Sequence, residues 1–551
     1  MTPPAIAAAL VDDDVATIDA LSNPLEDNSS VAANDPLGRK IRVLSGEGCQ
    51  FEADDDLKGK LCLTDDGILR VDPDAKGDLH VLSYMARLRR NNVPFREVEA
   101  GHSEIQNLYQ RGFVSAVQSG ETQKTTDTQG DVLRMVGEAA KLGASDIHIV
   151  IDSEATYVRY RIHGILRDRF EVSRDRGDAL VATIYNSMCD MADGNREPHR
   201  DQNGRFKEVY SRRCGLYVAR VATGPAGDGS HTVIRLYADN GDYPKSLLDL
   251  GYLPEQVELI ETAMRRTSGM ILISGTTGSG KTTTLANLLK SELVKTDGQI
   301  CIITAEDPVE QPISVLLKEG DKTRRVQAQQ KPVRAVDPSE EAVAAAWVKV
   351  IDHMLRSDPD IMMIGELRSR ASIIAAVRGV LTGHLSLATI HAMDATTTLE
   401  RLEDSGVERN LLTDPSLFVG LINQGLVSLL CPHCSKPFNS VKHSLRPDLV
   451  KRIEQYCTPD TVNIKGAGCS KCDGGVVGRT VCAEVIVPSR GFMDAYRERG
   501  KYASRQYWIE RMDGITRCNH MRRLINSGTV CPDLAERVLV PLDHDDLDMV
   551  G

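Results

Sequence analysis

The sequence lacks any apolar run of the roughly 18 to 20 residues that a membrane-spanning helix needs. Its first stretch, MTPPAIAAALVDDDVATIDAL, has no basic segment ahead of an apolar core, so we expect no signal peptide. An excess of positive charge is also missing: the formal net charge is −12, which excludes a general polyanion binder but leaves room for a local basic groove.

The composition is otherwise that of a soluble globular protein, with 41% hydrophobic and 26% charged residues. A chain of 551 residues is long enough for about three to four domains. Its 13 cysteines are an odd number. Without an export signal, we expect free thiols and a metal site rather than disulfides.

The first part of the chain shows no chemical signature. Residues 1–37 are rich in Ala, Asp, Asn, Ser and Pro and are predicted to form a mobile acidic tail. Residues 38–125 are predicted to form a small domain and linker, in which KIRVLS indicates a strand, LHVLSYMARLRRNN a helix and Gly120–Gly130 a polar connection. We expect this domain to dock a partner, although a plain structural extension fits the sequence equally well.

Residues 126–243 are predicted to form a second, α+β domain. Apolar residues at helical spacing in DVLRMVGEAAKLGA indicate a helix that stops at Gly143. Alternating residues then indicate strands in SDIHIVID, on both sides of the glycine in TYVRYRIHGILRDRF, and in LYVARVATGP and HTVIRLYA. Alternation does not tell which of the strand arginines face a ligand: Arg159, Arg161, Arg167, Arg205, Arg220 and Arg235.

The third domain, residues 244–551, contains the most specific motif. Met270–Ile273 indicates a buried strand and a helical pattern starts at Lys281, so ILISGTTGSGKTTTL reads as strand, glycine loop and helix. Glycines let backbone amides wrap closely around phosphate, and a helix N-terminus favours an anion. We expect Lys281 to reach the β- and γ-phosphates of ATP and the Thr282 hydroxyl to hold Mg²⁺. The predicted nucleotide-binding residues are Gly275, Thr276, Thr277, Gly278, Ser279, Gly280, Lys281, Thr282, Thr283 and Asp307.

Three further apolar segments that end in polar residues indicate the rest of a parallel α/β sheet: QICIITAEDPVEQPI, DPDIMMIGELRS and LTGHLSLATIHAMDA. Reactive groups of such a sheet collect at the carboxyl ends of its strands. We therefore expect Glu306, Asp307, Glu366 and His391 beside the phosphate loop. His384 and His391 flank the strand LSLATI, and we expect each to hydrogen-bond phosphate, although a lone histidine is more often structural.

Transfer of a phosphoryl group from ATP to water needs charge neutralisation, Mg²⁺ and an oriented water molecule. Glu366, after the strand Ile361–Ile364, is the best-placed carboxylate to polarise that water. We expect Glu306 and Asp307 to hold Mg²⁺ through water or to position the nucleophile. A catalytic arginine, often supplied by a neighbouring subunit, is also expected.

A second motif consists of two C-x-x-C pairs, Cys431 with Cys434 and Cys469 with Cys472. Four thiolates can close a tetrahedral Zn²⁺ site, and a site without an open position is structural. The 34 intervening residues exceed the usual spacing, but loop length costs little closure entropy. Because the insert at about 428–485 has few apolar residues, we expect metal to do much of its folding. The alternatives are buried free thiols, a redox pair, or replacement of one ligand by Cys457 or Cys482.

These motifs, in this order, resemble the secretion ATPases that power type II secretion and type IV pilus assembly, the GspE/PilB group. The resemblance covers about Asp131 to Val540. The family's aspartate box, Walker B segment and histidine box here read ITAEDPVEQPI, LRSDPDIMMIGELRS and LTGHLSLATIHAMDA. Upstream, GASDIHI, RYRIHGILRD, QNGRF, RVATGP and VIRL look like the family's second N-terminal domain.

The resemblance implies a RecA-like ATPase domain, preceded by a PAS-like α+β domain and interrupted by the zinc insert. It implies that Glu366 is the catalytic carboxylate and that Glu306 assists at the metal. It also implies that Arg220 and Arg235 reach nucleotide at the interface of two lobes. The chain departs from the family at Ser369, where aspartate is usual.

For function, the resemblance implies a cytoplasmic homo-hexamer, peripheral to the inner membrane, that hydrolyses ATP. It would act through a membrane-embedded platform protein on pilin or pseudopilin subunits, and the zinc insert favours assembly or secretion over retraction.

A conjugative or nucleic-acid-translocating motor is an alternative, but the acidic balance and the lack of an aromatic and basic groove argue against nucleic acid as a partner. A nucleotide-gated scaffold without hydrolysis is a third interpretation, and the presence of Lys281 and Glu366 argues against it.

Overall fold

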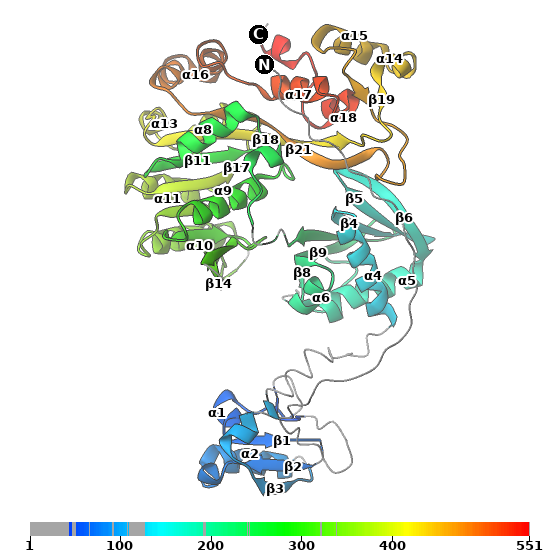
Figure 1. Cartoon of the computed structure of the whole chain (residues 1–551), viewed down its shortest axis with the longest axis vertical. Helices are drawn as coiled ribbons and strands as arrows, with labels where there is room; N and C mark the ends of the chain where they lie inside the picture. The colour runs from blue at the N-terminus through cyan, green and yellow to red at the C-terminus, as the bar shows by residue number, and fades with distance from the viewer. Residues whose placement is uncertain are drawn as a thin grey trace, which may run out of the picture. The chain divides into compact units, whose positions relative to one another are not determined.

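The structure is a computed structural model that describes residues 43–46, 51–65, 67–90, 93–106, 108–109, 127–190, 194–239, 241, 243–319, 322–337 and 339–549 (Figure 1). The chain divides into two compact units, Met1–Lys124 and Thr125–Gly551. The predicted acidic tail, and the predicted linker up to residue 126, lie outside the described residues. Within the described ranges, every helix is too short or too polar to cross a membrane.

The N-terminal unit contains a small three-stranded sheet in the order β1-β2-β3, antiparallel and then parallel. Its elements are α1 (Asp55–Lys58), β1 (Leu61–Leu63), β2 (Ile68–Val71), the 3₁₀ helix η1 (Pro73–Ala75), α2 (Leu79–Arg90) and β3 (Arg96–Glu99). Helix α2 buries Val81, Tyr84 and Leu88 in the core of this unit. The predicted helix is confirmed, whereas the described part of KIRVLS forms only an isolated bridge between Val43 and Thr64.

The second unit begins with a seven-stranded antiparallel sheet in the order β6-β5-β4-β10-β9-β8-β7. The strands are β4 (Ala144–Ile151), β5 (Ala155–Ile162), β6 (Ile165–Ser173), β7 (Cys189–Asp190), β8 (Gln202–Phe206), β9 (Leu216–Ala226) and β10 (Gly229–Ala238). One face packs on α4 (Asp127–Lys141), α5 (Arg174–Ala182), the π-helical η2 (Thr183–Met188) and α6 (Glu208–Arg213). The predicted helix and strands are all present, and the PAS-like character of the domain stays a prediction.

The third domain contains a second seven-stranded sheet, in the order β15-β12-β16-β17-β11-β18-β21. Its strands are β11 (Gly269–Ser274), β12 (Ile302–Glu306), β15 (Gln329–Pro332), β16 (Ile361–Ile364), β17 (Leu385–Ile390), β18 (Phe418–Leu430) and β21 (Val476–Ile486). Neighbouring strands run parallel except that β21 pairs antiparallel with β18. The four predicted strands, β11, β12, β16 and β17, are parallel as expected, and the antiparallel β21 makes the whole sheet mixed.

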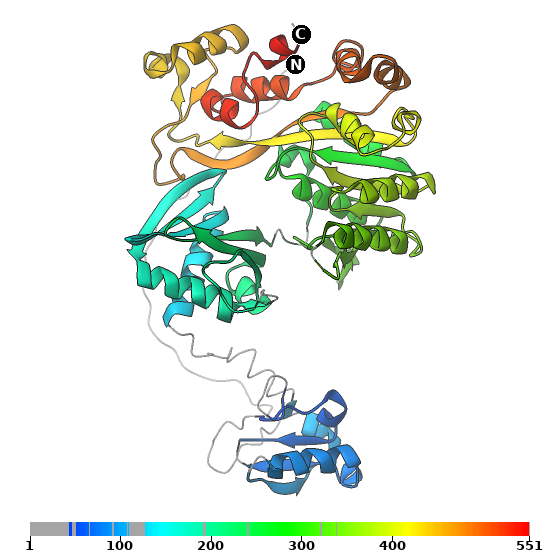
Figure 2. The same cartoon turned by 180° about the vertical axis from the view of Figure 1, so that it is seen from behind.

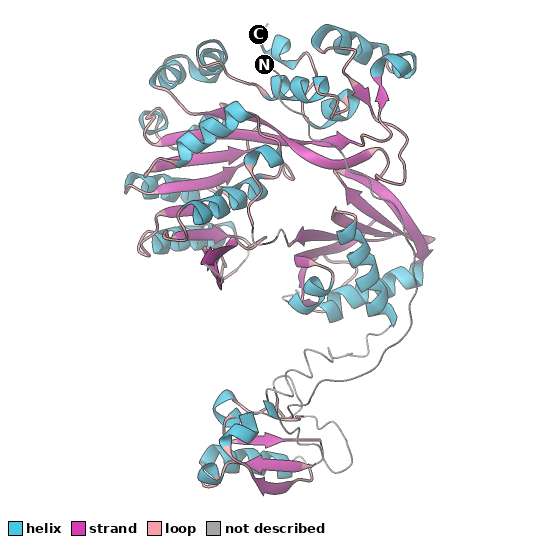
Figure 3. Cartoon of the chain, in the orientation of Figure 1, coloured by secondary structure: helices cyan, strands magenta, loops and turns pink. Residues whose placement is uncertain are grey.

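Helices cover both faces of this sheet, so the domain has three layers (Figure 3). Alternate residues of a strand enter different cores: Ile271 and Ile273 pack with α8 and α9, whereas Met270 and Leu272 belong to the core of the other helices. The first core contains α7 (Leu247–Leu250), α8 (Pro254–Met264), α9 (Lys281–Lys295) and β13 (Ser314–Glu319), the last of which pairs with β14 (Lys322–Gln327). The second contains α10 (Glu340–Met354), α11 (Arg370–Leu381), α12 (Thr397–Asp404), α13 (Arg409–Leu412) and α16 (Arg490–Arg511).

Strands β18 and β21 extend beyond the sheet as a long ribbon, and the cysteine-containing insert lies between them (Figures 1 and 2). The insert consists of β19 (Lys436–Pro437), α14 (Phe438–Val441), η3 (Lys442–Ser444), α15 (Pro447–Tyr456) and β20 (Asn463–Ile464). It shares an apolar core with the last helices, α17 (Arg517–Asn526) and α18 (Pro532–Val538), after which α19 (His544–Met549) ends the described chain.

A buried ion pair joins the C-terminal helices to the edge of the sheet. Arg505 of α16 lies 3.1 Å from Glu484 of β21, and the two side chains are only 12% and 2% exposed. Glu484 also accepts hydrogen bonds from the amides of Ala395 and Arg517. Removing one partner of such a pair leaves a buried charge without compensation.

We predict that Glu484→Ala destabilises the ATPase domain by about 3 to 5 kcal/mol, because the buried Arg505 then loses its ion pair with Glu484 and the amides of Ala395 and Arg517 lose their acceptor. The chain has two tryptophans, Trp347 and Trp508, and both are buried in this domain. Urea unfolding followed by tryptophan fluorescence therefore measures the effect.

Glu319→Ala is the control for this prediction. It removes one partner of the exposed pair with Arg324, whose side chains are 42% and 53% exposed. It is expected to cost less than about 1 kcal/mol. Equal losses of stability in the two variants would contradict the importance of the buried pair.

Candidate active site

The phosphate loop lies between the end of β11 and the start of α9. Gly275 has a φ of +144° and Gly280, directly before Lys281, has a φ of +85°. These values favour glycine. A Cβ atom on Gly275 would also lie 2.3 Å from the carbonyl oxygen of Gln424. The loop thus follows the tight backbone path that its glycines predict.

The residues of the loop offer donors to an anion. Lys281 Nζ donates to the carbonyl oxygens of Gly275 (2.8 Å) and Thr276 (3.1 Å). Burial lowers the pKa of Lys281, and the nearby carboxylate of Glu366 opposes that shift. The Ser279 hydroxyl is buried and has no hydrogen-bond partner among the described residues. A lysine beside a buried, unpartnered hydroxyl fits a bound phosphate.

The other predicted loop residues differ in exposure. Thr276, Thr277 and Gly278 are exposed at the top of the loop. Thr282 and Thr283 are half-buried in the first turn of α9, and the carbonyl oxygen of Thr282 accepts a hydrogen bond from Gln311. These threonines thus lie in or directly beside the phosphate loop.

Glu366 lies beside this loop, after β16. Its Oε2 is 2.6 Å from Arg368 Nη2 and its Oε1 is 2.9 Å from His391 Nε2. Burial raises the pKa of Glu366, but Arg368, His391 and Lys281 together hold it below the usual value. Glu366 is therefore an ionised, half-buried carboxylate with both oxygens oriented.

The two acidic residues of the aspartate box are placed differently. Glu306 ends β12 and is only 4% exposed, and its Oε1 accepts hydrogen bonds from Thr304 (2.6 Å) and Gln330 (2.9 Å). Burial raises the pKa of Glu306 despite these donors. Asp307 is exposed, and its charge acts on Arg368. Both residues share the sheet edge of Glu366, as predicted from the strand ends.

The two predicted histidines lie at opposite ends of β17. His391 follows the strand and contacts Glu366, and burial lowers its pKa, so the ring is neutral near pH 7. His384 precedes the strand and contacts the Thr382 hydroxyl at 2.9 Å. Six strand residues separate them by roughly 20 Å. The structure thus brings His391, and not His384, to the edge that holds the phosphate loop.

Four of the six predicted strand arginines lie in a row across the antiparallel sheet. The strand register aligns Arg205, Arg220, Arg235, Asp146 and Arg161 on neighbouring strands. Asp146 is the one carboxylate of this row, with its oxygens 3.0 Å from Arg235 Nε and 3.9 Å from Arg161 Nε. Arg220 is exposed. The row therefore carries an excess of positive charge on the face opposite the core that this sheet forms with α4, α5, η2 and α6.

One contact joins this sheet to the aspartate box. The hydroxyl of Tyr237, which follows Arg235 by two positions on β10, donates to Glu310 Oε1 at 2.9 Å. Burial and Glu310 raise the pKa of Tyr237, while Arg220 lowers it, which places Arg220 at the same contact. Arg220 thus lies next to residues that neighbour the phosphate loop.

Several residues of the site escaped the sequence analysis. Glu310 and Arg368 lie in quoted motifs, but no pattern distinguishes them from surface charges. Gln424 is completely buried on β18 and contacts the phosphate loop. The sequence does contain a signal for Gln424, because Asn423 and Gln424 are polar residues that interrupt the apolar strand FVGLINQGLVSLL.

The four predicted cysteines converge. The Sγ atoms of Cys431, Cys434, Cys469 and Cys472 all lie within 4.8 Å of one another, with separations of 3.7 to 3.9 Å for three of the pairs. Zn–S bonds of about 2.3 Å in a tetrahedron require sulfur separations of about 3.8 Å. The four thiols therefore fit a structural zinc ion, whose chemistry would be to hold the two turns together.

Backbone amides favour a thiolate in this cluster. The amides of Cys469 and Gly475 donate to Cys472 Sγ at 3.2 and 3.3 Å. Burial opposes ionisation, yet these donors and the neighbouring thiols bring the pKa of Cys472 to about 7. The twelve described cysteines are all free of disulfides. Cys457 and Cys482 lie in the neighbouring apolar core rather than in the cluster.

The insert does not depend on metal alone. Phe438, Leu449, Ile453 and Val462 are buried together with residues of α17 and α18. This apolar core corrects the expectation that the insert has little apolar surface to bury.

Two arginines of the antiparallel sheet form ion pairs with the insert beside its cysteines. Arg167 Nε lies 2.6 Å from Asp473 Oδ2, and Arg169 Nη2 lies 3.3 Å from Asp473 Oδ1. Ser428 of β18 also donates to the carbonyl oxygen of His163, in the turn between β5 and β6. Figures 1 and 2 both show this hairpin beside the ends of β18 and β21.

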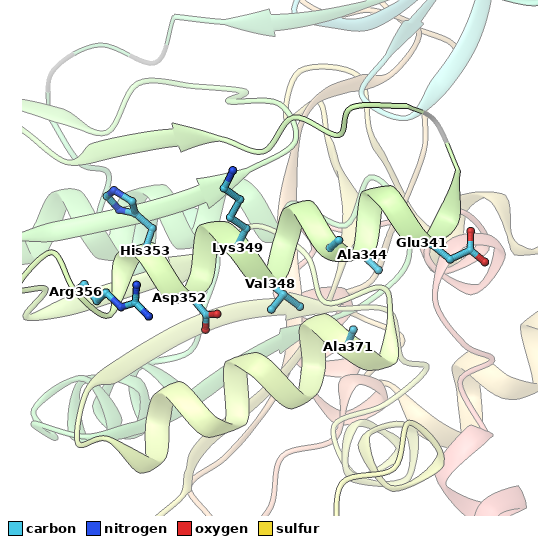
Figure 4. Close-up of a pocket in the computed structure, with 9 residues that line it drawn as sticks. Glu341, Ala344, Val348, Lys349, Asp352, His353, Arg356 and Ala371 are labelled. Atoms are coloured by element: carbon cyan, nitrogen blue, oxygen red, sulfur yellow. The ribbon is translucent and has the colours of Figure 1, made fainter.

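A separate groove of about 700 Å³ runs along α10 and the start of α11 (Figure 4). It is lined by Glu341, Ala344, Ala345, Val348, Lys349, Asp352, His353, Arg356 and Ala371. None of the predicted site residues is among them, so the groove is not part of the phosphate-loop site.

Known proteins resemble this chain over most of its length. A family model described as "Type II/IV secretion system protein" matches residues 122–533. Type II secretion system protein E of Pseudomonas aeruginosa is 32% identical over 381 residues, which cover 68% of this chain and 69% of that protein. Type II secretion system ATPase E of Vibrio cholerae is 32% identical over 376 residues, 68% of each chain. Among solved structures, the ATPase DotB of Legionella pneumophila is similar with a TM-score of 0.49 at 20% identity, covering 73% of this chain and 94% of that one.

We predict that the purified protein contains about one zinc ion per chain and that Cys431→Ser and Cys469→Ser each remove it, because three thiolates hold zinc less tightly than four. Cys457→Ser is the matched control, since this thiol lies outside the cluster. Elemental analysis of the metal gives the result. Unchanged zinc in the first two variants would exclude these ligands.

Proposed function

Because the chain belongs to the type II/IV secretion system protein family, we propose that it is an ATPase motor that drives pilus assembly or type II-like secretion. The observation that supports this most directly is the placement of Lys281 and an ionised Glu366 at one edge of the sheet. A scaffold that only binds nucleotide needs the phosphate loop. Hydrolysis also needs a carboxylate that orients water.

In this proposal the loop from Gly275 to Gly280 wraps the phosphates of ATP, and Lys281 neutralises the β- and γ-phosphates. The Ser279 hydroxyl, buried and without a described partner, donates to the same anion. Mg²⁺, held by Thr282, would supply further charge neutralisation. Thr276, Thr277 and Thr283 would complete the site, and exposed Asp307, which follows β12 and acts on Arg368, would take part from the same edge of the sheet.

Glu366 would polarise the attacking water. Arg368 and His391 fix its two oxygens, so its lone pairs have a set direction before substrate arrives. Glu306, buried at the end of the neighbouring strand, would assist at the metal through water or position the nucleophile. We give His384 no part in this reaction, because it lies at the other end of β17.

Arg220 and Arg235 are proposed to stabilise charge on the phosphates from the antiparallel sheet. The row that contains them has one carboxylate for four arginines, and Arg220 is exposed. An arginine supplied by a neighbouring subunit is a recurring device in phosphoryl transfer. We therefore propose a homo-hexamer in which these arginines complete the site of the same or the next subunit.

The work of the motor would be done on a membrane. We propose that the protein is cytoplasmic and binds peripherally to the inner membrane, where it acts on a platform protein and through it on pilin or pseudopilin. Type IV pilus assembly ATPase TfpB of Acinetobacter baylyi is 32% identical over 355 residues, which cover 64% of this chain and 54% of that protein. The zinc insert favours assembly or secretion over retraction.

We predict that Glu366→Gln lowers the turnover of ATP at least about 100-fold, because the neutral amide does not polarise water. Binding of Mg-ADP, measured by fluorescence titration, should change less than threefold, since the phosphate loop is intact. Glu319→Gln, an exposed change on β13, is the control. Retained turnover in a pure sample of the Glu366 variant would refute the role of this carboxylate.

We further predict different effects for the two histidines. His391→Ala removes a neighbour that orients Glu366, and is expected to lower kcat about 10- to 100-fold, as small misplacements of a catalytic group do. His384→Ala should leave kcat within about twofold, because it lies roughly 20 Å from that carboxylate. Steady-state phosphate release measures both. Equal losses would show that the far histidine acts in the reaction.

A further inference from the structure

A buried glutamine on β18 lies against the phosphate loop from behind. Strand β18 pairs with β11 so that Asn423 is level with Ser274, the last residue before the loop. The next residue, Gln424, is therefore level with Gly275. Its side chain is completely buried, and its backbone oxygen leaves no space for a side chain at Gly275.

The amide of Gln424 bonds to three separate parts of the domain. Its Nε2 donates to the carbonyl oxygen of Ser279 at 2.7 Å. Its Oε1 accepts from the Tyr252 hydroxyl at 2.5 Å and from Thr284 Oγ1 at 3.0 Å. Tyr252 lies between α7 and α8, and Thr284 lies in the first turn of α9. One side chain thus ties the loop to the helix that follows it and to the start of the domain.

The bond to Ser279 fixes the direction of a backbone donor. The carbonyl of Ser279 and the N–H of Gly280 belong to one planar trans peptide, so they point in opposite directions. Holding the carbonyl against the buried Gln424 turns the Gly280 N–H away from β18, toward the concave side of the loop. Backbone N–H groups at that place are what a phosphate needs.

The glycines of the loop explain why the Ser279–Gly280 peptide needs a hydrogen bond from outside the loop. Gly278 and Gly280 both adopt positive φ values, +78° and +85°. Glycine populates both signs of φ about equally, so the loop's own sterics do not fix the orientation of the peptides between them. A hydrogen bond from a rigid strand removes that freedom before a ligand arrives, which favours binding.

We propose that Gln424 is a positioning residue for nucleotide binding, which holds the Ser279–Gly280 peptide with its N–H toward the phosphates. The inference rests on the proposed function, since it takes nucleotide as the ligand of the loop. The loop binds the phosphates equally well in the ground state and in the transition state. Loss of the hydrogen bond from Gln424 to Ser279 therefore raises KM and leaves kcat nearly unchanged.

The test compares Gln424→Met with Gln256→Met. Gln256 is a second buried glutamine, 1% exposed, whose Nε2 donates to the Ala483 carbonyl at 2.7 Å and whose Oε1 caps α8. Methionine keeps the volume and removes the hydrogen bonds. We expect the Kd for Mg-ADP to rise about tenfold in Gln424→Met and to change less than twofold in Gln256→Met. KM for ATP should rise similarly in the first variant, with kcat within twofold of wild type.

Hydrogen exchange gives a second measurement that does not need ligand. Amides of Thr276 to Gly280 should exchange faster in Gln424→Met than in wild type, and Gln256→Met should leave them unchanged. Should Gln424→Met not fold, Gln424→Asn keeps an amide that is too short to reach Ser279, and the same rise in Kd is expected.

The outcomes separate this inference from the proposed function. Wild-type protein that binds no Mg-ADP overturns both. Wild type that binds, with equal affinity in the Gln424 variants, overturns only the role of Gln424. An equal loss of affinity in Gln256→Met shows that destabilisation alone explains the effect, and also overturns it.

Discussion

Parallel hydrogen bonding between β11, β12, β16 and β17 is the constraint on which the site depends. It places the carboxyl ends of these strands at one edge, although the residues that follow them are spread from Gly275 to His391. Short loops then need only small adjustments to bring Lys281, Glu366 and His391 together. The chemistry is therefore a consequence of strand direction first and of side-chain contacts second.

The same sheet connects the site to the rest of the unit. Strand β18 contacts the phosphate loop through Gln424 and runs on to Cys431, while its partner β21 returns from Cys472 to Glu484, which bonds to Ala395 a few residues after His391. The two strands are hydrogen-bonded over this whole distance. The cysteine cluster thus lies at the far end of a ribbon whose near end contacts the phosphate loop.

The sequence predicted the positions of individual strands well, because these depend on local patterns of apolar and polar residues. The strands Ile361–Ile364 and Leu385–Ile390 were predicted to the residue, because each is a short apolar run with polar ends. Pairing partners depend on distant segments, so neither the antiparallel β21 nor the contact of Gln424 with Ser279 could be read from the sequence. His384 is a different case, since it precedes Leu385–Ile390, and the rule that reactive groups lie at the carboxyl ends of parallel strands already favours His391.

The ion pairs of Arg167 and Arg169 with Asp473 limit how the antiparallel sheet can move relative to the ATPase domain of its own chain. At the other end, the chain that follows β10 and the contact of Tyr237 with Glu310 form a second attachment. A rigid body held at two points keeps a single rotation, about the line that joins them. A rotation about that line is the motion that both attachments leave to these two domains, and Arg220, at the Tyr237 contact, lies close to the line.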